Sequence, residues 1–131
     1  MAVVRTIVVD HVLFVVKDLR ASRAFYTTAL GPLGFKVMYE QEDGLGLGDD
    51  NADDFAIFEG KLGEPTTTAA HVAFAAESRE AVDAFFEAAM AAGGTEIRRP
   101  GIRPEYHAGY YAAFVYDPDR NNVEAVYHGP H

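Results

Sequence analysis

Residues 11–34, HVLFVVKDLRASRAFYTTALGPLG, are followed at a spacing of 60 positions by the similar residues 71–94, HVAFAAESREAVDAFFEAAMAAGG. Eight of the 24 aligned positions are identical, whereas chance would give about two or three. The identities include a histidine at the start of each copy, His11 and His71, and a glycine at the end. This internal repeat indicates two copies of one supersecondary unit.

Each copy begins with apolar, largely β-branched residues that predict a strand, over 7–16 in the first copy and 70–76 in the second. A helix is expected after each strand, because Asp18 and Ser78 are suitable N-caps and apolar residues follow at helical spacing. The predicted buried stripes consist of Phe25, Tyr26, Ala29 and Leu30 in the first copy, and Val82, Phe85, Phe86, Ala89 and Met90 in the second. Gly31-Pro32 and Gly93-Gly94 are expected to end the helices.

The rest of each copy predicts three short strands separated by turn residues such as Asp43-Gly44 and Asp117-Pro118-Asp119. The expected strands are 35–40, 45–48 and 54–59 in the first copy, and 95–98, 111–117 and 121–128 in the second. The sequence therefore predicts an α+β fold of two tandem βαβββ modules, at about 5–60 and 68–129, within a single domain over 1–131. The two modules either share one sheet within a chain or pair across a dimer.

Composition excludes several classes of function. The 131 residues include no cysteine, which rules out thiolate metal sites, disulfides and cysteine nucleophiles. The net charge of −9 argues against nucleic-acid binding. No apolar run approaches the roughly 18 residues of a membrane span, and no targeting signal is recognisable at the start. We expect a soluble, cytoplasmic protein without a membrane partner.

Strand periodicity places the two repeated histidines on equivalent faces. Side chains alternate along a strand, so His71 shares one face with Ala73 and Ala75, while the larger Val72 and Phe74 occupy the other. The larger residues form the better surface for a helix to cover, and the histidines then point to the uncovered face. Two interpretations stay open, a pair of metal ligands or two satisfied polar residues near strand starts.

A carboxylate with a matching position is Glu124, which lies between Val123 and Ala125 in the last predicted strand. A carboxylate in such an apolar strand is costly unless it is paired or bound to metal. An exposed glutamate on an edge strand is the simpler alternative. As a metal ligand, Glu124 would form with His11 and His71 a set of two histidines and one carboxylate, which leaves coordination positions open on a divalent metal.

Several stretches resemble the vicinal oxygen chelate superfamily, namely Asp10-His11-Val12, Phe25-Tyr26, residues 30–35, residues 71–74, and Asp117-Pro118-Asp119 followed by residues 122–124. This superfamily includes glyoxalase I, bleomycin-resistance proteins, fosfomycin-modifying thiol transferases and extradiol dioxygenases. The resemblance implies a cup-shaped mixed sheet with a divalent metal, Fe, Mn, Zn or Ni, held by His11, His71 and Glu124. It also implies a homodimer, because members often complete their cups across chains.

Two positions depart from the family pattern. Glyoxalase I carries a fourth ligand, a glutamate, where this chain has Ala56 or Ile57, and Glu59 stands two or three residues too late. This difference argues against glyoxalase I chemistry. Arg120 occupies a turn position at which the family commonly has glycine, which predicts either an unusual backbone conformation there or a shifted turn.

The loop over 98–111 is rich in arginine, tyrosine and histidine and precedes the strands that lead to Glu124. It is either a solvated loop or the rim of a binding site. As a rim it would supply Tyr106 and His107 as proton-transfer or orienting residues, because histidine titrates near neutral pH. Arg103 and Tyr111 would then bind substrate, with Arg103 meeting an anionic group.

The function we predict from the sequence is that of a metal-dependent enzyme of the glyoxalase/dioxygenase type, a lyase, thiol transferase or dioxygenase. It would act on a small, oxygen-rich substrate that chelates the metal. The alternative is a non-catalytic protein of the bleomycin-resistance type that binds an antibiotic or metabolite in the same cup.

Overall fold

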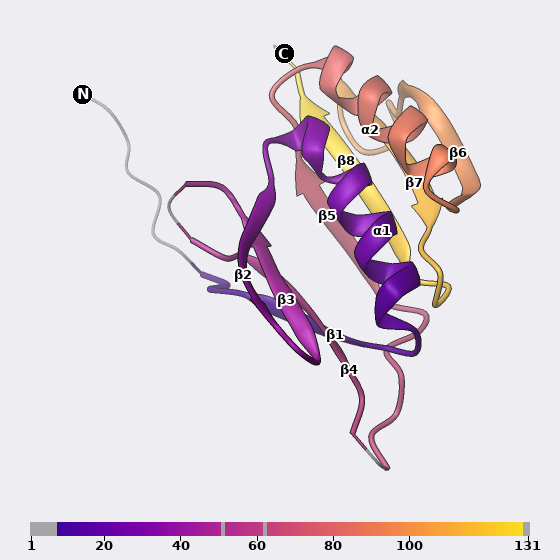
Figure 1. Cartoon of the computed structure of the whole chain (residues 1–131). Helices are drawn as coiled ribbons and strands as arrows, with labels where there is room; N and C mark the ends of the chain where they lie inside the picture. Colours follow the sequence, from indigo (N-terminus) through magenta and orange to yellow (C-terminus); the bar gives the residue numbers. More distant parts are fainter. Residues whose placement is uncertain (1–7, 51, 62, 130–131) are drawn as a thin grey trace.

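The computed structural model describes residues 8–50, 52–61 and 63–129, and within them the βαβββ pattern occurs twice (Figure 1). The first module contains β1 (Val12–Val16), α1 (Leu19–Ala29), a 3-10 helix η1 (Gly31–Leu33), β2 (Lys36–Gln41), β3 (Gly44–Gly48) and β4 (Phe55–Glu59). The second contains β5 (His71–Ala75), α2 (Arg79–Ala91), β6 (Thr95–Ile102), β7 (Tyr110–Tyr116) and β8 (Asn122–His128). The predicted α+β fold of two tandem modules is confirmed.

Each module forms its own four-stranded mixed sheet. The strand order is β1-β4-β3-β2 in the first sheet and β5-β8-β7-β6 in the second. The β1–β4 and β5–β8 pairs are parallel, and the remaining pairs are antiparallel. The second strand order repeats the first, so residues that match in the sequence repeat occupy equivalent places in the two sheets.

Local signals fix the helices where the sequence predicts them. The Asp18 and Ser78 side chains accept hydrogen bonds from the backbone nitrogens of Ala21 and Ala81, at 3.3 and 3.1 Å. One part of the second stripe is wrong, because Met90 is 38% exposed. It lies roughly 100° around α2 from the centre of the buried stripe, at the edge of the covered surface. No described helix has the length and apolar character needed to cross a membrane.

The first strand is shorter than predicted. It begins at Val12, so residues 8–11 are outside it, and residue 7 lies outside the described residues. His11 therefore precedes β1, whereas His71 is the first residue of β5. The two histidines match in the sequence repeat, but only His71 is part of a strand.

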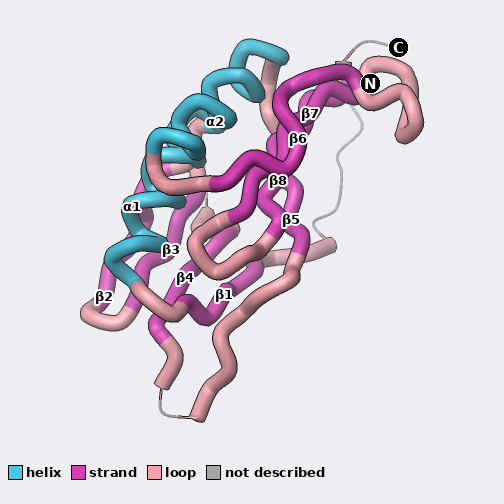
Figure 2. The backbone as a smooth tube through the Cα atoms, turned by 90° about the vertical axis from the view of Figure 1, so that its right-hand side faces the viewer, coloured by secondary structure: helices cyan, strands magenta, loops and turns pink. Residues whose placement is uncertain are grey.

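One apolar core joins the two modules. The side chains of both sheets that face the helices contribute to it, and Phe55 of β4 meets Phe74 of β5 with ring centroids 5.3 Å apart. Figure 2 shows the helices gathered on one side of the strands. The opposite face of each sheet, here called its open face, borders solvent, as the 48% exposure of Leu13 on β1 illustrates.

A buried polar network connects α1 to the turn between β7 and β8. The Tyr26 hydroxyl donates to Oδ2 of Asp117 at 2.5 Å, and Oδ1 of Asp117 accepts from the backbone nitrogens of Asp119 and Asn121 at 2.8 Å. Burial, together with the neighbouring Asp117, raises the pKa of Tyr26. Asp117 therefore anchors the turn of the second module to the helix of the first.

Candidate functional site

The open face of the second sheet carries polar residues above an apolar floor. Directly paired residues on neighbouring strands point to the same side of a sheet. One cross-strand row on this face consists of His71, Asn122 and Tyr116, and the next consists of Ala73, Glu124, Phe114 and Arg98. Ala75, Ala112 and Val126 continue the floor beyond them.

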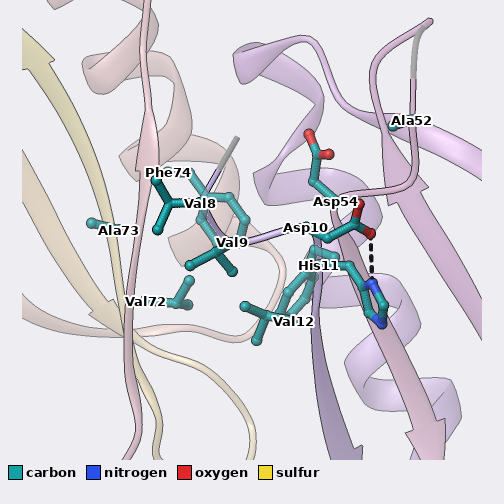
Figure 3. Close-up of a pocket in the computed structure, with 11 residues that line it drawn as sticks. Val8, Val9, Asp10, His11, Val12, Ala52, Asp54, Val72, Ala73 and Phe74 are labelled. Atoms are coloured by element: carbon teal, nitrogen blue, oxygen red, sulfur yellow. Dashed lines mark hydrogen bonds and ion pairs between the residues drawn. The ribbon is translucent and has the colours of Figure 1, made fainter. Parts of the chain in front are cut away.

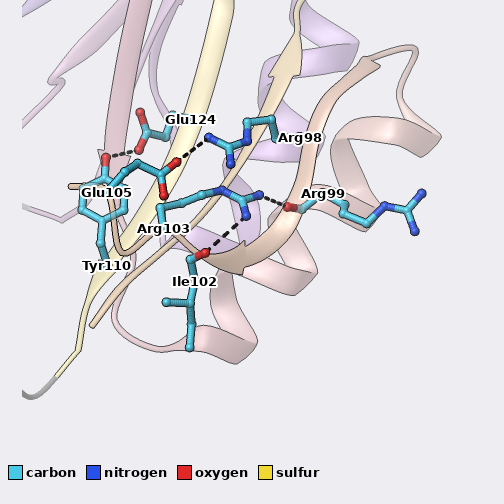
Figure 4. Close-up of polar contacts among 7 residues, drawn as sticks. All are labelled: Arg98, Arg99, Ile102, Arg103, Glu105, Tyr110 and Glu124. Carbon is cyan, nitrogen blue, oxygen red and sulfur yellow. Dashed lines mark hydrogen bonds and ion pairs between the residues drawn. The ribbon is translucent and has the colours of Figure 1, made fainter. Parts of the chain in front are cut away.

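Glu124 is the central polar group of this face. It is only 2% exposed, and its Oε1 atom lies 2.8 Å from Nε2 of His71. Its Oε2 atom accepts a hydrogen bond from the Tyr110 hydroxyl (Figure 4). No lysine or arginine among the described residues pairs with it. Of the two alternatives that the sequence leaves open for Glu124, the structure has the buried, paired carboxylate, with a histidine and a tyrosine as its partners.

Tyr110 is a residue that the sequence prediction missed. Burial and its hydrogen bond to Glu124 raise its pKa, so it remains a proton donor to the carboxylate. Strand alternation alone places Tyr110 on the same face as Phe114 and Tyr116, but its contact with Glu124 depends on how the strands are paired. Such a hydroxyl orients the carboxylate, as outer partners commonly do for metal ligands.

The chemistry of His71 and Glu124 fits a divalent metal. Imidazole nitrogen and carboxylate oxygen are ordinary ligands, with bonds of about 2.0–2.2 Å. Two such ligands at right angles are about 3 Å apart, close to the 2.8 Å between Nε2 of His71 and Oε1 of Glu124. The hydrogen bond between these two atoms would give way to two metal–ligand bonds when a metal binds.

His11 lies apart from this pair. Its Nδ1 atom is 2.8 Å from Oδ1 of Asp10, and this hydrogen bond raises the pKa of His11. Figure 3 shows its ring turned away from Val72 and Ala73 of β5. Within the described ranges, no group of three His, Cys, Asp or Glu side chains is placed to hold a metal ion. One chain thus brings together His71 and Glu124 of the predicted triad, but not His11.

Strand register shows which residue of the first module corresponds to Glu124. Ala73 pairs with Glu124, and Leu13, 60 positions before Ala73, pairs with Ala56. Ala56 therefore occupies the equivalent position, and it has no metal-binding atom in its side chain. Glu59 lies three residues further along β4 and accepts from the backbone nitrogen of Leu19 at 3.2 Å.

The predicted proton-transfer residues lie beside Tyr110. The Tyr110 ring is 5.3 Å from the His107 ring and 4.8 Å from the Tyr106 ring, measured between centroids. Nδ1 of His107 lies 2.7 Å from the carbonyl oxygen of Ala108, which only accepts, so this nitrogen carries a proton. Nε2 of His107 lies 2.9 Å from Nδ1 of His128.

The two predicted substrate-binding residues make contacts of a different kind. The Arg103 guanidinium donates to the carbonyl oxygens of Arg99 and Ile102 and so holds its own loop (Figure 4). The Tyr111 hydroxyl donates to Asp83 of α2 at 2.7 Å, which places Tyr111 on the helix side of the sheet. These placements argue against contact between either residue and a ligand on the open face.

Two cavities adjoin the histidines. One of about 670 Å³ lies beside His11 and between the modules, and it is lined mainly by apolar side chains that include Val12, Phe55, Val72 and Phe74 (Figure 3). The other, of about 380 Å³, lies at the end of the second sheet beside His71. Its lining consists of Thr68, Ala69, Ala70, His71, Tyr116, Arg120 and Asn122.

Comparison with known proteins agrees with this arrangement. Residues 8–125 match the family model of the Glyoxalase/Bleomycin resistance protein/Dioxygenase superfamily. The chain belongs to this superfamily. Proteins of this fold bind small molecules, which fits an open sheet face with polar groups above an apolar floor.

Individual relatives in the superfamily cover nearly the whole chain. A Bacillus subtilis (strain 168) protein named "Uncharacterized protein YqjT" is 32% identical over 88% of this chain and 95% of its own. A crystal structure of a glyoxalase/bleomycin resistance protein from Albidiferax ferrireducens T118 is 34% identical, with a TM-score of 0.77 over 90% of this chain and 96% of its own. Lactoylglutathione lyase from Agrobacterium tumefaciens, at 17% identity and a TM-score of 0.65 over 92% of each chain, shares the fold alone.

Proposed function

We propose that the protein is a metal-dependent enzyme of the superfamily that acts on a small, oxygen-rich molecule. His71 and Glu124 of one chain would hold the divalent metal together with His11 of a second copy. The observation that supports this most directly is the buried Glu124 carboxylate, in contact with the imidazole of His71 on an open sheet face. Two neutral imidazoles and one carboxylate leave positions free for the substrate's oxygens.

The second copy is proposed because the ligand set is divided between the modules. The helix-facing sides of both sheets are buried in the shared core, so the open faces are the surfaces of the sheets that can contact another chain. The open face of the first sheet exposes apolar groups, among them Leu13 and Tyr39, at 48% and 37%. A homodimer that sets this face against the second sheet of its partner would cover them and bring His11 toward His71 and Glu124.

The side chains around the pair have distinct tasks in this proposal. A bound metal would supply Lewis-acid polarisation of the substrate's oxygens. Tyr110 fixes the orientation of the Glu124 carboxylate through its hydroxyl. His107, whose ring packs against Tyr110, is the group that we propose to accept or return a proton. The small side chains of Ala73, Ala75 and Ala112 leave room above the sheet.

Subunit mixing tests this arrangement. His11→Ala and His71→Ala should each lose stoichiometric Mn²⁺ or Zn²⁺ binding in calorimetric titration. After the two variants are unfolded together and refolded, about one quarter of the wild-type sites should return, because half of the dimers are mixed and each has one intact site. No recovery, although mixed dimers are detected by mass spectrometry, would contradict a site shared between chains.

A non-catalytic binding protein is a second candidate. One observation favours it, since both oxygens of Glu124 already have hydrogen-bonding partners within the protein. The apolar floor would then hold the ligand, and the polar groups would orient it. Elemental analysis of protein purified without an affinity tag distinguishes the two candidate functions. The enzyme should contain stoichiometric metal, whereas the binding protein requires none.

A further inference from the structure

Arg120 adopts a backbone conformation that is unfavourable for its residue type. It lies in the turn between β7 and β8 with φ of +67°, and Ala69 with φ of +60° is the other non-glycine residue with positive φ in the described part of the chain. Both residues line the same 380 Å³ cavity beside His71. Strained positions of this kind cluster at functional sites. Glycine would adopt this conformation freely, so the backbone geometry does not explain why an arginine stands at this position.

The exposed Arg120 side chain lies over an aromatic ring. Its guanidinium carbon lies 3.8 Å from the centroid of the Tyr116 ring, and no carboxylate in the described ranges forms an ion pair with it. Arg98 offers a contrast on the same sheet face, since it also lies over an aromatic ring but pairs with Glu105 at 3.1 Å. The cavity beside His71 therefore presents a cation without a counter-ion.

Asn122 adds a second unsatisfied group to the same cavity. Its Oδ1 atom is buried and has no hydrogen-bond partner among the described residues. A buried acceptor without a partner is costly, and a ligand that brings a donor relieves this cost. The residues that line the cavity thus include a positively charged side chain and, just beneath the surface, an amide oxygen that a small shift of the Asn122 side chain would present to a ligand.

We propose that this cavity binds the anionic end of the substrate and that the substrate is a small hydroxycarboxylate. Arg120 takes the carboxylate, with its planar fork of N–H donors, and Asn122 accepts the proton of the neighbouring hydroxyl. His71 lines the cavity and also contacts Glu124, so a ligand held here lies next to the proposed metal ligands. The inference rests on the proposed function for its place in a reaction, but binding itself is measurable without metal.

The test is an NMR titration of the metal-free protein with glycolate, the simplest 2-hydroxycarboxylate. Wild type should show saturable shifts at His71, Tyr116 and Asn122, and Arg120→Gly should weaken the affinity at least tenfold. Because glycine suits a positive φ, this variant should fold as well as wild type. Arg120→Lys keeps the positive charge but not the planar fork of donors, so its affinity for glycolate should lie between those of wild type and Arg120→Gly. Arg99→Gln, which removes one charge at a side chain that is 78% exposed, is the matched control and should bind like wild type.

Two further probes sharpen the assignment. Glycolamide, which replaces the carboxylate by a neutral amide, should not bind, and inorganic phosphate should bind more weakly than glycolate because it is not held through a neighbouring alcohol. No saturable glycolate binding by wild type, or equal affinity in Arg120→Gly, would overturn the proposal. Phosphate binding as tight as that of glycolate would overturn the hydroxycarboxylate assignment. The subunit-mixing experiment reports on the metal alone, so the two ideas fail separately.

Discussion

Replacing Glu124 by glutamine changes the proposed metal ligand with little change in shape. His71 Nε2 and the Tyr110 hydroxyl both point at the carboxylate, so one of them would then face an amide NH₂ in place of an acceptor. A hydrogen bond to a charged group contributes about 1.5–3 kcal/mol, and removal of a buried charge offsets part of that loss. We expect the metal-free variant to lose about 1–3 kcal/mol of unfolding free energy. This corresponds to a melting temperature lower by roughly 4–12 °C.

Metal should stabilise the wild type and not the variant. A free metal concentration of 100 times the dissociation constant adds about 2.7 kcal/mol to the unfolding free energy. The amide of Glu124→Gln lacks the negative charge, so most of this gain should disappear. Tyr110→Phe keeps the carboxylate but frees its orientation, and its metal affinity should fall about 10–100-fold.

The measurement is urea unfolding followed by circular dichroism, with EDTA or with Mn²⁺ or Zn²⁺. Glu105→Gln is the control, since this half-exposed carboxylate lies in the loop between β6 and β7 and pairs with Arg98 of the same sheet. It should keep the full response to metal. Equal stabilisation of wild type and Glu124→Gln by metal would refute the ligand role of Glu124. An unchanged stability of the metal-free variant would refute the contribution assigned to its two hydrogen bonds.

Three other outcomes follow from the structure. Tyr26→Phe removes the buried hydroxyl that donates to Asp117 and should cost about 1.5–3 kcal/mol in urea unfolding. Because the pKa of Tyr26 is raised, its contribution to stability is complete below about pH 10 and is lost as the pH rises from there through the folded-state pKa. Unfolding between pH 7 and 11 would detect the onset of this loss. Gly48→Ala would drive its Cβ into the backbone carbonyl oxygen of Ala52 and should destabilise the protein by about 1–3 kcal/mol, measured by thermal melting. Arg120→Gly relieves a positive φ and loses a cation–π contact, so its unfolding free energy should be unchanged or higher by up to about 1 kcal/mol.

Features set by local sequence were predictable. Asp18 and Ser78 cap the helices as expected, and Phe25 and Tyr26 are buried on the predicted stripe. The repeat gave the two modules, and alternation along β5 put His71 on the uncovered face. Each of these depends on residues a few positions apart, where spacing and chemistry are enough.

Features set by pairing between distant segments were not predictable. The equivalent of Glu124 stayed ambiguous between Ala56 and Ile57, because a shift of one residue in register changes the face of a strand. The Tyr110–Glu124 contact requires the register of β7 against β8. The separation of His11 from His71 follows from how the two sheets pack around one core, which periodicity within either module does not specify.

The alanine at position 56 has a consequence for electroneutrality. A divalent cation held by two neutral imidazoles and one carboxylate keeps one uncompensated positive charge, whereas a second carboxylate in the place of Ala56 would cancel it. An uncompensated charge raises the free energy of a poorly hydrated site, and a monoanion that binds the metal lowers it again. An alanine in place of a carboxylate at position 56 would thus favour monoanionic ligands over neutral ligands of similar shape.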